Sequence, residues 1–224
     1  HRCPAIDDVR LAAYYGYATI QAYGTVTYEP FQELAAYVLK EVIPYKLKHL
    51  SGHESEATMT FDLYSLRNTD ENDNVITSSP YNDRLYGKGG SDTLVYTILK
   101  EDATGGHGKD EWMDFTYGTV ENNREADRLD LRQLFTLKEV EVNGKGEVIS
   151  VNEKQQKVTE DNLHTFLGVE ARNGGKEIVV SIDRDGAESK YAFTELITLH
   201  VQNPKDVRVG DVYEMMENGQ ILLP

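Results

Sequence analysis

Cysteine is nearly absent from this chain of 224 residues, and Cys3 is the only one. No intrachain disulfide can form, which does not fit a small secreted domain held together by disulfides. The composition does fit a protein that is exported unfolded and is cross-linked afterwards by bound metal ions.

Long hydrophobic runs are also missing. No apolar stretch approaches the roughly 18 residues of a membrane-spanning helix, so we expect a protein that is not transmembrane. The first ten residues, His1 to Arg10, lack the apolar core of a secretory signal peptide. We therefore expect no cleavable signal at this end.

Basic residues are scarce relative to acidic ones. There are 23 Lys and Arg against 38 Asp and Glu, which gives a formal net charge of −15. We expect no nucleic acid partner, because phosphates require a basic face. So acidic a chain repels itself unless cations neutralise it. Extracellular calcium would do so, although the charge also has a simpler explanation, which is solubility.

One segment, residues 81–115, carries a nine-residue pattern. Its best copy, Gly105–Trp112, matches the calcium-binding nonapeptide G-G-x-G-x-D-x-U, in which U is apolar. A second copy, Gly87–Leu94, reads GKGGSDTL, and the acidic slots of two poorer copies hold Asp83 and Glu101. Two good copies in phase predict a short parallel β-roll, against the alternative of a Gly-rich hairpin.

The residue types suit calcium. Glycine permits the positive φ that turns backbone carbonyls toward an ion, and Asp supplies a hard carboxylate oxygen. Turns on one side of such a roll lie two repeats apart, so we expect Asp92 to stack with Asp110, and Asp83 with Glu101 to bind weakly or not at all. The expected Ca²⁺ ligands in the two good turns are Gly87, Gly89, Gly90, Asp92, Gly105, Gly106, Gly108 and Asp110.

Residues 1–66 alternate in polarity as strands do. Ala18–Tyr28 breaks at Gly24, which suits a hairpin turn, and two more strands are expected at Val42–Lys48 and Ala57–Leu63. The strings GTVTYEPFQELAA and IPYKLKHLSGHESEATMTF resemble the second half of bacterial Ig-like or cadherin-like adhesin repeats. The resemblance covers about residues 16–64 and implies an Ig-like β-sandwich.

The segment between this module and the repeats, residues 67–80, is polar and predicts a linker. An interdomain calcium site at Asp70–Asn74 is the alternative reading. An EF-hand fails there, because Val75 stands where glycine is required.

Residues 81–224 resemble the C-terminal region of RTX-type giant adhesins and biofilm-associated proteins of Gram-negative bacteria. The motifs that carry this resemblance keep their order: Ala103–Gly118, Ala126–Leu131, Phe166–Val169, Ile178–Gly186, Leu199 and Asn218–Leu222. The resemblance implies type I secretion through an ABC transporter, an adaptor and an outer-membrane channel, with an uncleaved C-terminal signal. It also implies that an Asp beyond the last repeat caps the final Ca²⁺, a role that falls to Asp127 and Asp130.

We therefore expect a mainly β chain. It comprises an Ig-like β-sandwich portion (1–66), a linker (67–80), a short Ca²⁺-binding parallel β-roll (81–118), and a β-sandwich-like type I secretion domain with a few short helices (119–224). The expected function is non-enzymatic support of biofilm or cell adhesion at the bacterial surface. A Ca²⁺-dependent module for a cell-surface glycan or peptide, and the export tail of an extracellular RTX hydrolase, are the alternatives.

Patterns typical of enzymes fail in this sequence. His53-Glu54 begins like a zinc-protease motif, but Ala57 stands where the second His belongs. No G-x-S-x-G is present. Asp183–Gly186 does not continue as an EF-hand and predicts a β-turn.

Overall fold

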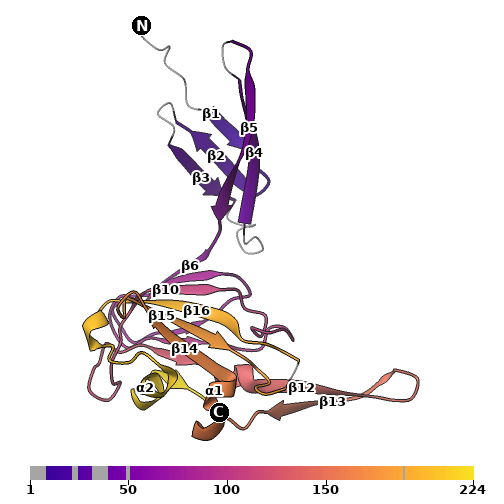
Figure 1. Cartoon of the computed structure of the whole chain (residues 1–224), viewed down its shortest axis with the longest axis vertical. Coiled ribbons are helices and arrows are strands. Elements are labelled where there is room, and N and C mark those ends of the chain that lie inside the picture. The colour runs from indigo at the N-terminus through magenta and orange to yellow at the C-terminus, as the bar shows by residue number, and fades with distance from the viewer. Residues whose placement is uncertain (1–8, 22–24, 32–39, 49–50, 189) are drawn as a thin grey trace. The chain divides into compact units, whose positions relative to one another are not determined.

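The computed structural model describes residues 9–21, 25–31, 40–48, 51–188 and 190–224 (Figure 1). The chain divides into two compact units, His1–Ser65 and Leu66–Pro224. The expected mainly β fold with a few short helices is confirmed.

The first unit contains a three-stranded antiparallel sheet and a separate hairpin. The sheet consists of β1 (Val9–Ala12), β2 (Gly16–Ile20) and β3 (Val26–Pro30), and the hairpin of β4 (Lys40–Lys48) and β5 (Glu54–Asp62). The strands expected from the alternating pattern are present. The expected turn at Gly24 lies outside the described residues.

A buried carboxylate joins the sheet of this unit to its hairpin. Glu41 on β4 accepts the N–H of Tyr15 at 2.8 Å and the hydroxyl of Tyr28 on β3 at 2.7 Å. The Tyr28 ring stacks on Phe61 of β5, with centroids 4.6 Å apart. Partial burial and the Glu41 carboxylate raise the pKa of Tyr28, so its hydroxyl remains a donor.

The second unit is built around a parallel β-roll with two sheets. The six-stranded sheet runs in the order β14 (Leu167–Arg172), β15 (Glu177–Ile182), β16 (Thr194–Val201), β10 (Asp110–Phe115), β8 (Asp83–Tyr86) and β6 (Ser65–Asn68). The four-stranded sheet runs in the order β17 (Ile221–Leu222), β11 (Arg128–Asp130), β9 (Thr93–Val95) and β7 (Val75–Thr77).

Apolar columns run across both sheets of the roll. In the four-stranded sheet, parallel register aligns Ile76, Leu94, Leu129 and Ile221. In the six-stranded sheet, parallel pairing aligns Leu85, Trp112 and Leu199, and the antiparallel pairing of β15 with β16 adds Ile178. All eight side chains are buried in one hydrophobic core. The apolar slots of three copies of the repeat, Leu85, Leu94 and Trp112, therefore point inward, as expected for the U position of a parallel β-roll.

Residues 67–80 are not a linker. β7 lies within this segment and pairs in parallel with β9, and β6 is the neighbour of β8. The sequence conceals β7 because a three-residue strand between two polar turns is too short to show alternation. The expected boundary between residues 118 and 119 is also absent, because β16 pairs with β10 and β11 pairs with β9.

Arg184 holds together three segments that are distant in sequence. Its guanidinium is fully buried and donates to the carbonyls of Leu134 at 2.7 Å, Asp102 at 2.7 Å and Thr136 at 3.0 Å. Glu101 lies 3.6 Å from it. A buried arginine is tolerated only when its donors are satisfied in this way.

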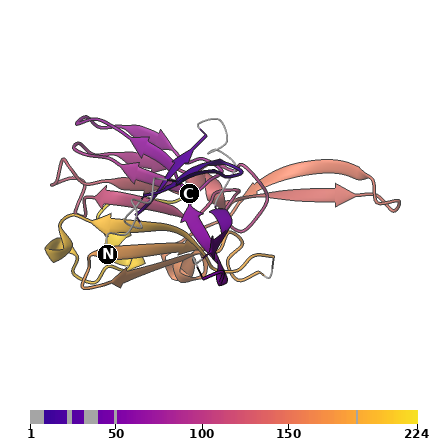
Figure 2. The same ribbon diagram turned by 90° about the horizontal axis from the view of Figure 1, so that it is seen from above.

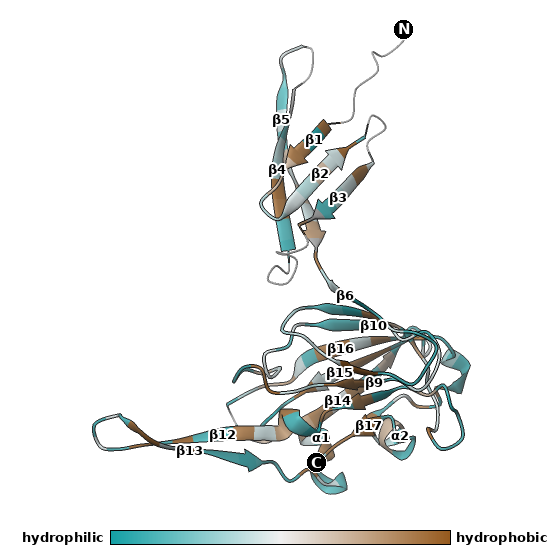
Figure 3. Cartoon of the chain, turned by 180° about the vertical axis from the view of Figure 1, so that it is seen from behind, coloured by the Kyte–Doolittle hydropathy of each residue, from teal (hydrophilic) through white to brown (hydrophobic). Residues whose placement is uncertain are grey.

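The remaining elements lie outside the roll. β12 (Thr136–Val142) and β13 (Val148–Gln155) form an isolated antiparallel hairpin, which projects from the two sheets in Figure 2. Figure 3 shows β9 and β15 as hydrophobic, whereas β13 changes from hydrophobic in its first half to hydrophilic in its second. The helical elements are α1 (Leu163–Phe166), α2 (Val212–Glu217) and three 3-10 turns at Arg132–Phe135, Glu160–Asn162 and Pro204–Asp206.

Leu94→Ala tests whether the apolar columns stabilise the roll. Leu94 is fully buried between Ile76 and Leu129, so its truncation should lower the free energy of unfolding by about 2–5 kcal/mol. Val151→Ala is the matched control, because Val151 is 54% exposed on the hairpin and should cost below about 0.5 kcal/mol. Equal losses in urea denaturation would contradict this assignment.

Candidate functional site

The turns of the roll lie along two edges. Edge A comprises the turns that lead from the six-stranded to the four-stranded sheet, residues 69–74, 87–92 and 116–127. Edge B comprises the turns that lead back, residues 78–82 and 96–109. The two glycine-rich turns of the repeat lie on different edges.

The expected stacking of Asp92 with Asp110 is therefore wrong. Asp92 belongs to edge A, where it neighbours Asn74, 18 residues earlier. Asp110 belongs to edge B, where it neighbours Asp83, 27 residues earlier. The 18 residues between them therefore make half a coil of the roll instead of a full one.

The repeat that would have formed the missing half coil is an excursion near Glu101. The N–H groups of Leu99 and Lys100 both donate to the carbonyl of Gly105, at 2.8 and 3.0 Å, and close a local turn. Ala103, in the apolar slot of this copy, is absent from the buried core. The weakest repeat thus loops out, and the next repeat returns to the edge of Asp83.

Edge A carries a column of hydrogen-bonded side chains. The N–H of Asn74 donates to Asp92 Oδ1 at 2.8 Å, and the N–H of Asp92 donates to Asp127 Oδ1 at 3.0 Å. Asp114 accepts the N–H groups of Gly87 and Lys88, at 2.8 and 2.9 Å. The carboxylates of each coil therefore accept backbone N–H groups from the turn of the preceding coil.

Three of these carboxylates are buried together. Asp92, Asp114 and Asp127 are 1%, 8% and 3% exposed, and none forms an ion pair with Lys or Arg in the described part of the chain. Burial, then repulsion from Asp114, raises the pKa of Asp92 to about 6. Burial, then repulsion from Asp92 and Asp114, raises the pKa of Asp127 to about 8.

One oxygen of this cluster is unused. Asp92 Oδ2 is buried and has no hydrogen-bond partner among the described residues. A Cβ on Gly87 would lie 2.5 Å from it, so only glycine leaves space beside this oxygen. An unpartnered carboxylate oxygen is a hard ligand of the kind that Ca²⁺ prefers.

Edge B offers no such oxygen. Asp110 Oδ1 accepts the N–H of Asp83 at 2.8 Å, and Oδ2 accepts the hydroxyls of Ser78 at 3.0 Å and Tyr96 at 2.7 Å. Burial raises the pKa of Asp110 to about 7. This carboxylate is occupied by protein donors, so it does not fit a metal ion.

The glycines of the edge B turn have a packing role. A Cβ on Gly106 would lie 2.6 Å from the backbone N of Lys100, and one on Gly108 would lie 2.4 Å from Asn82 Oδ1. Gly105 and Gly106 also have positive φ, of 73° and 91°. They allow the excursion to fold tightly against the preceding turn.

Other expected ligands are placed differently. Asp130 lies outside the edge A column and pairs with Arg132 at 2.6 Å, which holds the pKa of Asp130 below its usual range. A Cβ on Gly89 would lie 2.7 Å from Glu71 Oε2, and Gly90 donates its N–H to Glu125 at 2.9 Å. Asp114 was missed, and Asn74 was named only as part of an alternative interdomain site. The spacing of 18 residues from Asp92 could have assigned Asn74 to edge A.

No ready-made metal site is present in the described residues. None of their His, Cys, Asp and Glu side chains form a group of three or more that could hold a metal ion. Edge A fits a cation by its donor chemistry and its unused oxygen, whereas edge B does not fit.

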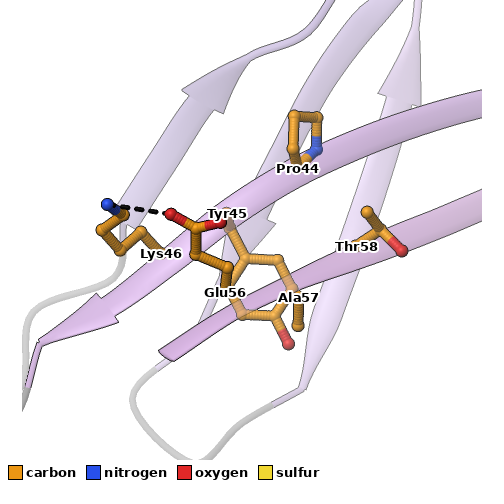
Figure 4. Close-up of a pocket in the computed structure, with 6 residues that line it drawn as sticks. All are labelled: Pro44, Tyr45, Lys46, Glu56, Ala57 and Thr58. Atoms are coloured by element: carbon orange, nitrogen blue, oxygen red, sulfur yellow. Dashed lines mark ion pairs between the residues drawn. The ribbon is translucent and has the colours of Figure 1, made fainter. Parts of the chain in front are cut away.

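The β4–β5 hairpin of the first unit also carries a hollow (Figure 4). It is lined by six residues from two adjacent strands, among which Lys46 and Glu56 pair at 2.9 Å. Its lining comes from one hairpin, and its charged groups are already paired with each other. It therefore shows no converging set of functional groups.

Comparisons with known proteins place the chain in no family. No family model matches it, and no curated protein does. Among solved structures, the extracellular lipase LipA from Serratia marcescens aligns with 97% of this chain and 31% of its own, at 13% identity and a TM-score of 0.19. So loose a likeness carries no argument about fold or activity. In the described residues, no helix is long and apolar enough to cross a membrane.

Proposed function

We propose that the second unit is a calcium-stabilised roll domain of a secreted bacterial adhesin and has no enzymatic activity. The observation that carries the proposal is the edge A cluster, in which Asp92, Asp114 and Asp127 are buried without a basic partner. Buried charge without compensation is costly, so protons or a cation must relieve it. Carboxylate oxygens are the ligands that Ca²⁺ prefers.

The residues at edge A have distinct parts in this proposal. Asp92 supplies the unused Oδ2, Asp114 and Asp127 supply neighbouring charge, and Gly87 leaves the space. Bound calcium supplies positive charge, and its binding free energy then becomes folding free energy. The proposed site omits the edge B residues Gly105, Gly106, Gly108 and Asp110.

Export and adhesion rest on the resemblance of the sequence to RTX-type adhesins. It supports passage through type I secretion machinery and a position outside the cell or at its surface. Extracellular calcium sites bind at roughly 10⁻⁴–10⁻³ M, far above cytosolic calcium levels. Repulsion at edge A would therefore persist inside the cell and keep the unit unfolded until after export.

Calcium titration of Asp92→Asn tests the proposed ligand. Calcium added to the EDTA-treated chain at pH 7.5 should raise its Tm, which is measured by circular dichroism. In Asp92→Asn, the calcium concentration for half-maximal stabilisation should rise about tenfold, because an interaction with a charged group is worth roughly 1.5–3 kcal/mol.

Asp110→Asn is the matched control for this titration. Asp110 occupies the same slot of the repeat, is also buried and also loses one charge, but its oxygens are already occupied. Its calcium midpoint should stay unchanged. Equal shifts in both variants, or a chain that calcium does not stabilise, would contradict the edge A site.

Stability without calcium should fall as pH rises from 5 to 8. The folded-state pKa values of Asp92, Asp110 and Asp127 are raised to about 6, 7 and 8 from 3.8. Protonation therefore stabilises the folded chain below pH 4, and this contribution is lost as pH passes each folded-state value. One unit of pKa shift corresponds to about 1.4 kcal/mol.

The measurement is the urea unfolding midpoint in EDTA across this pH range. In saturating calcium the decline should be smaller, because the cation favours the ionised carboxylates of edge A. A midpoint that rises from pH 5 to pH 8 in EDTA would show that these carboxylates do not govern stability.

A further inference from the structure

A polar cleft lies between the turn that follows β10 and the segment that precedes α2. Its volume is about 530 Å³, and its walls come from residues 117–123 and 205–208 together with Glu214 and Asn218. Small-molecule sites have volumes of about 300–1,000 Å³. None of the edge A carboxylates lines this cleft.

Hydrogen bonds from side chains fix the walls. Asn203 accepts the N–H of Tyr117 at 2.8 Å and donates to its carbonyl at 2.6 Å. Gln220 accepts the N–H of Gly118 at 3.0 Å. Glu214 accepts the N–H groups of Val209 and Gly210, at 2.6 and 2.7 Å. A cleft held in this way needs little ordering when a ligand enters.

A buried hydroxyl in the lining lies near a carboxylate without a well-formed hydrogen bond. Tyr117 is 1% exposed, and its hydroxyl, which is close to Glu214, makes no hydrogen bond of standard geometry with the described residues. Burial, and then the nearby Glu214 carboxylate, raise the pKa of Tyr117, so the group remains a donor. Leaving a buried donor unsatisfied costs free energy, and a ligand acceptor would remove that cost.

Unpaired polar groups stand at the mouth of the cleft. Lys205 is exposed and forms no hydrogen bond or ion pair within the described residues, and the Asn122 side chain likewise has none. The neighbouring carboxylates are engaged, since Asp206 accepts Asn203 Nδ2 at 2.6 Å and Glu214 accepts Arg208 Nε at 3.2 Å. Lys205 is thus a free cation in a chain of net charge −15.

We propose that this cleft binds an acidic saccharide, meaning a sugar that carries a carboxylate. Sugar hydroxyls can form hydrogen bonds with the side-chain amides of Asn122 and Asn123 and with the Tyr117 hydroxyl. The ammonium group of Lys205 can form a charge-assisted hydrogen bond with the sugar carboxylate. A neutral sugar would leave Lys205 unpaired, and a simple carboxylate would leave the amides unpaired. The inference does not depend on calcium at edge A.

Calorimetric titration of the whole chain with monosaccharides at pH 7 tests the proposal, both in calcium and in EDTA. The acidic probes are glucuronate, galacturonate and N-acetylneuraminate, and the controls are glucose and acetate. At least one acidic sugar should bind saturably and about tenfold more tightly than either control, because a charge-assisted hydrogen bond adds that much.

Two variants locate the binding. Lys205→Gln and Tyr117→Phe should each weaken the acidic sugar about tenfold. Tyr117→Phe should not lower the Tm of the free chain, because the hydroxyl makes no hydrogen bond of standard geometry there. Lys138→Gln is the matched control, since it removes the same charge from the β12–β13 hairpin.

The outcomes separate clearly. The proposal is overturned when none of the three acidic sugars binds, when glucose or acetate binds as tightly, or when Lys138→Gln weakens binding as much as Lys205→Gln. The proposal is supported, in calcium or in EDTA, when Tyr117→Phe and Lys205→Gln each weaken binding of the acidic sugar and Tyr117→Phe does not lower the Tm.

Discussion

Backbone N–H groups in the turns of the roll have no strand partner, and carboxylates from neighbouring coils accept them. Asp92, Asp114 and Asp127 do this at edge A, and Asp110 does it at edge B. Asp83 accepts the N–H of Ser79 within its own turn. Buried backbone donors must be satisfied, so these acids cannot be replaced by apolar side chains of similar size. The apolar columns can form only because the turns that connect them are closed in this way.

The same solution concentrates negative charge where water is excluded. The two edges differ in how they relieve it. At edge B, two hydroxyls and an amide surround Asp110, and His107 lies 2.9 Å from one of those hydroxyls, on Ser78. At edge A, amides serve the carboxylates but leave Asp92 Oδ2 unpartnered. The Asp110 carboxylate is thus fully occupied by protein donors, whereas the Asp92 carboxylate keeps one oxygen free to bind a cation.

The sequence predicted the local strands well, but it did not predict which edge of the roll each turn occupies. Period-two alternation located the strands of the first unit, and the apolar slots at Leu85, Leu94 and Trp112 were read correctly as core. The choice of edge for Asp110 was not readable, because Glu101 keeps the nine-residue spacing while its copy loops out. That excursion is held by Arg184, 82 residues beyond Asp102, and no local pattern reports so distant a contact. Of the edge A carboxylates, the sequence predicted Asp92 and Asp127 as ligands but not Asp114, which lies outside the repeat motif.

Each roll sheet is extended by strands from far along the chain. β16 pairs with β10 in one sheet, and β17 pairs with β11 in the other, where Gln220 donates to the carbonyl of Asp127, 93 residues earlier. Such distant parallel pairings form slowly. Until they form, β10 and β11 present open edges, which are templates for strands of other molecules. The interval between emergence of β11 and arrival of β17 is thus the period in which neighbouring chains compete with the correct partner, and loss of β17 would make that competition permanent.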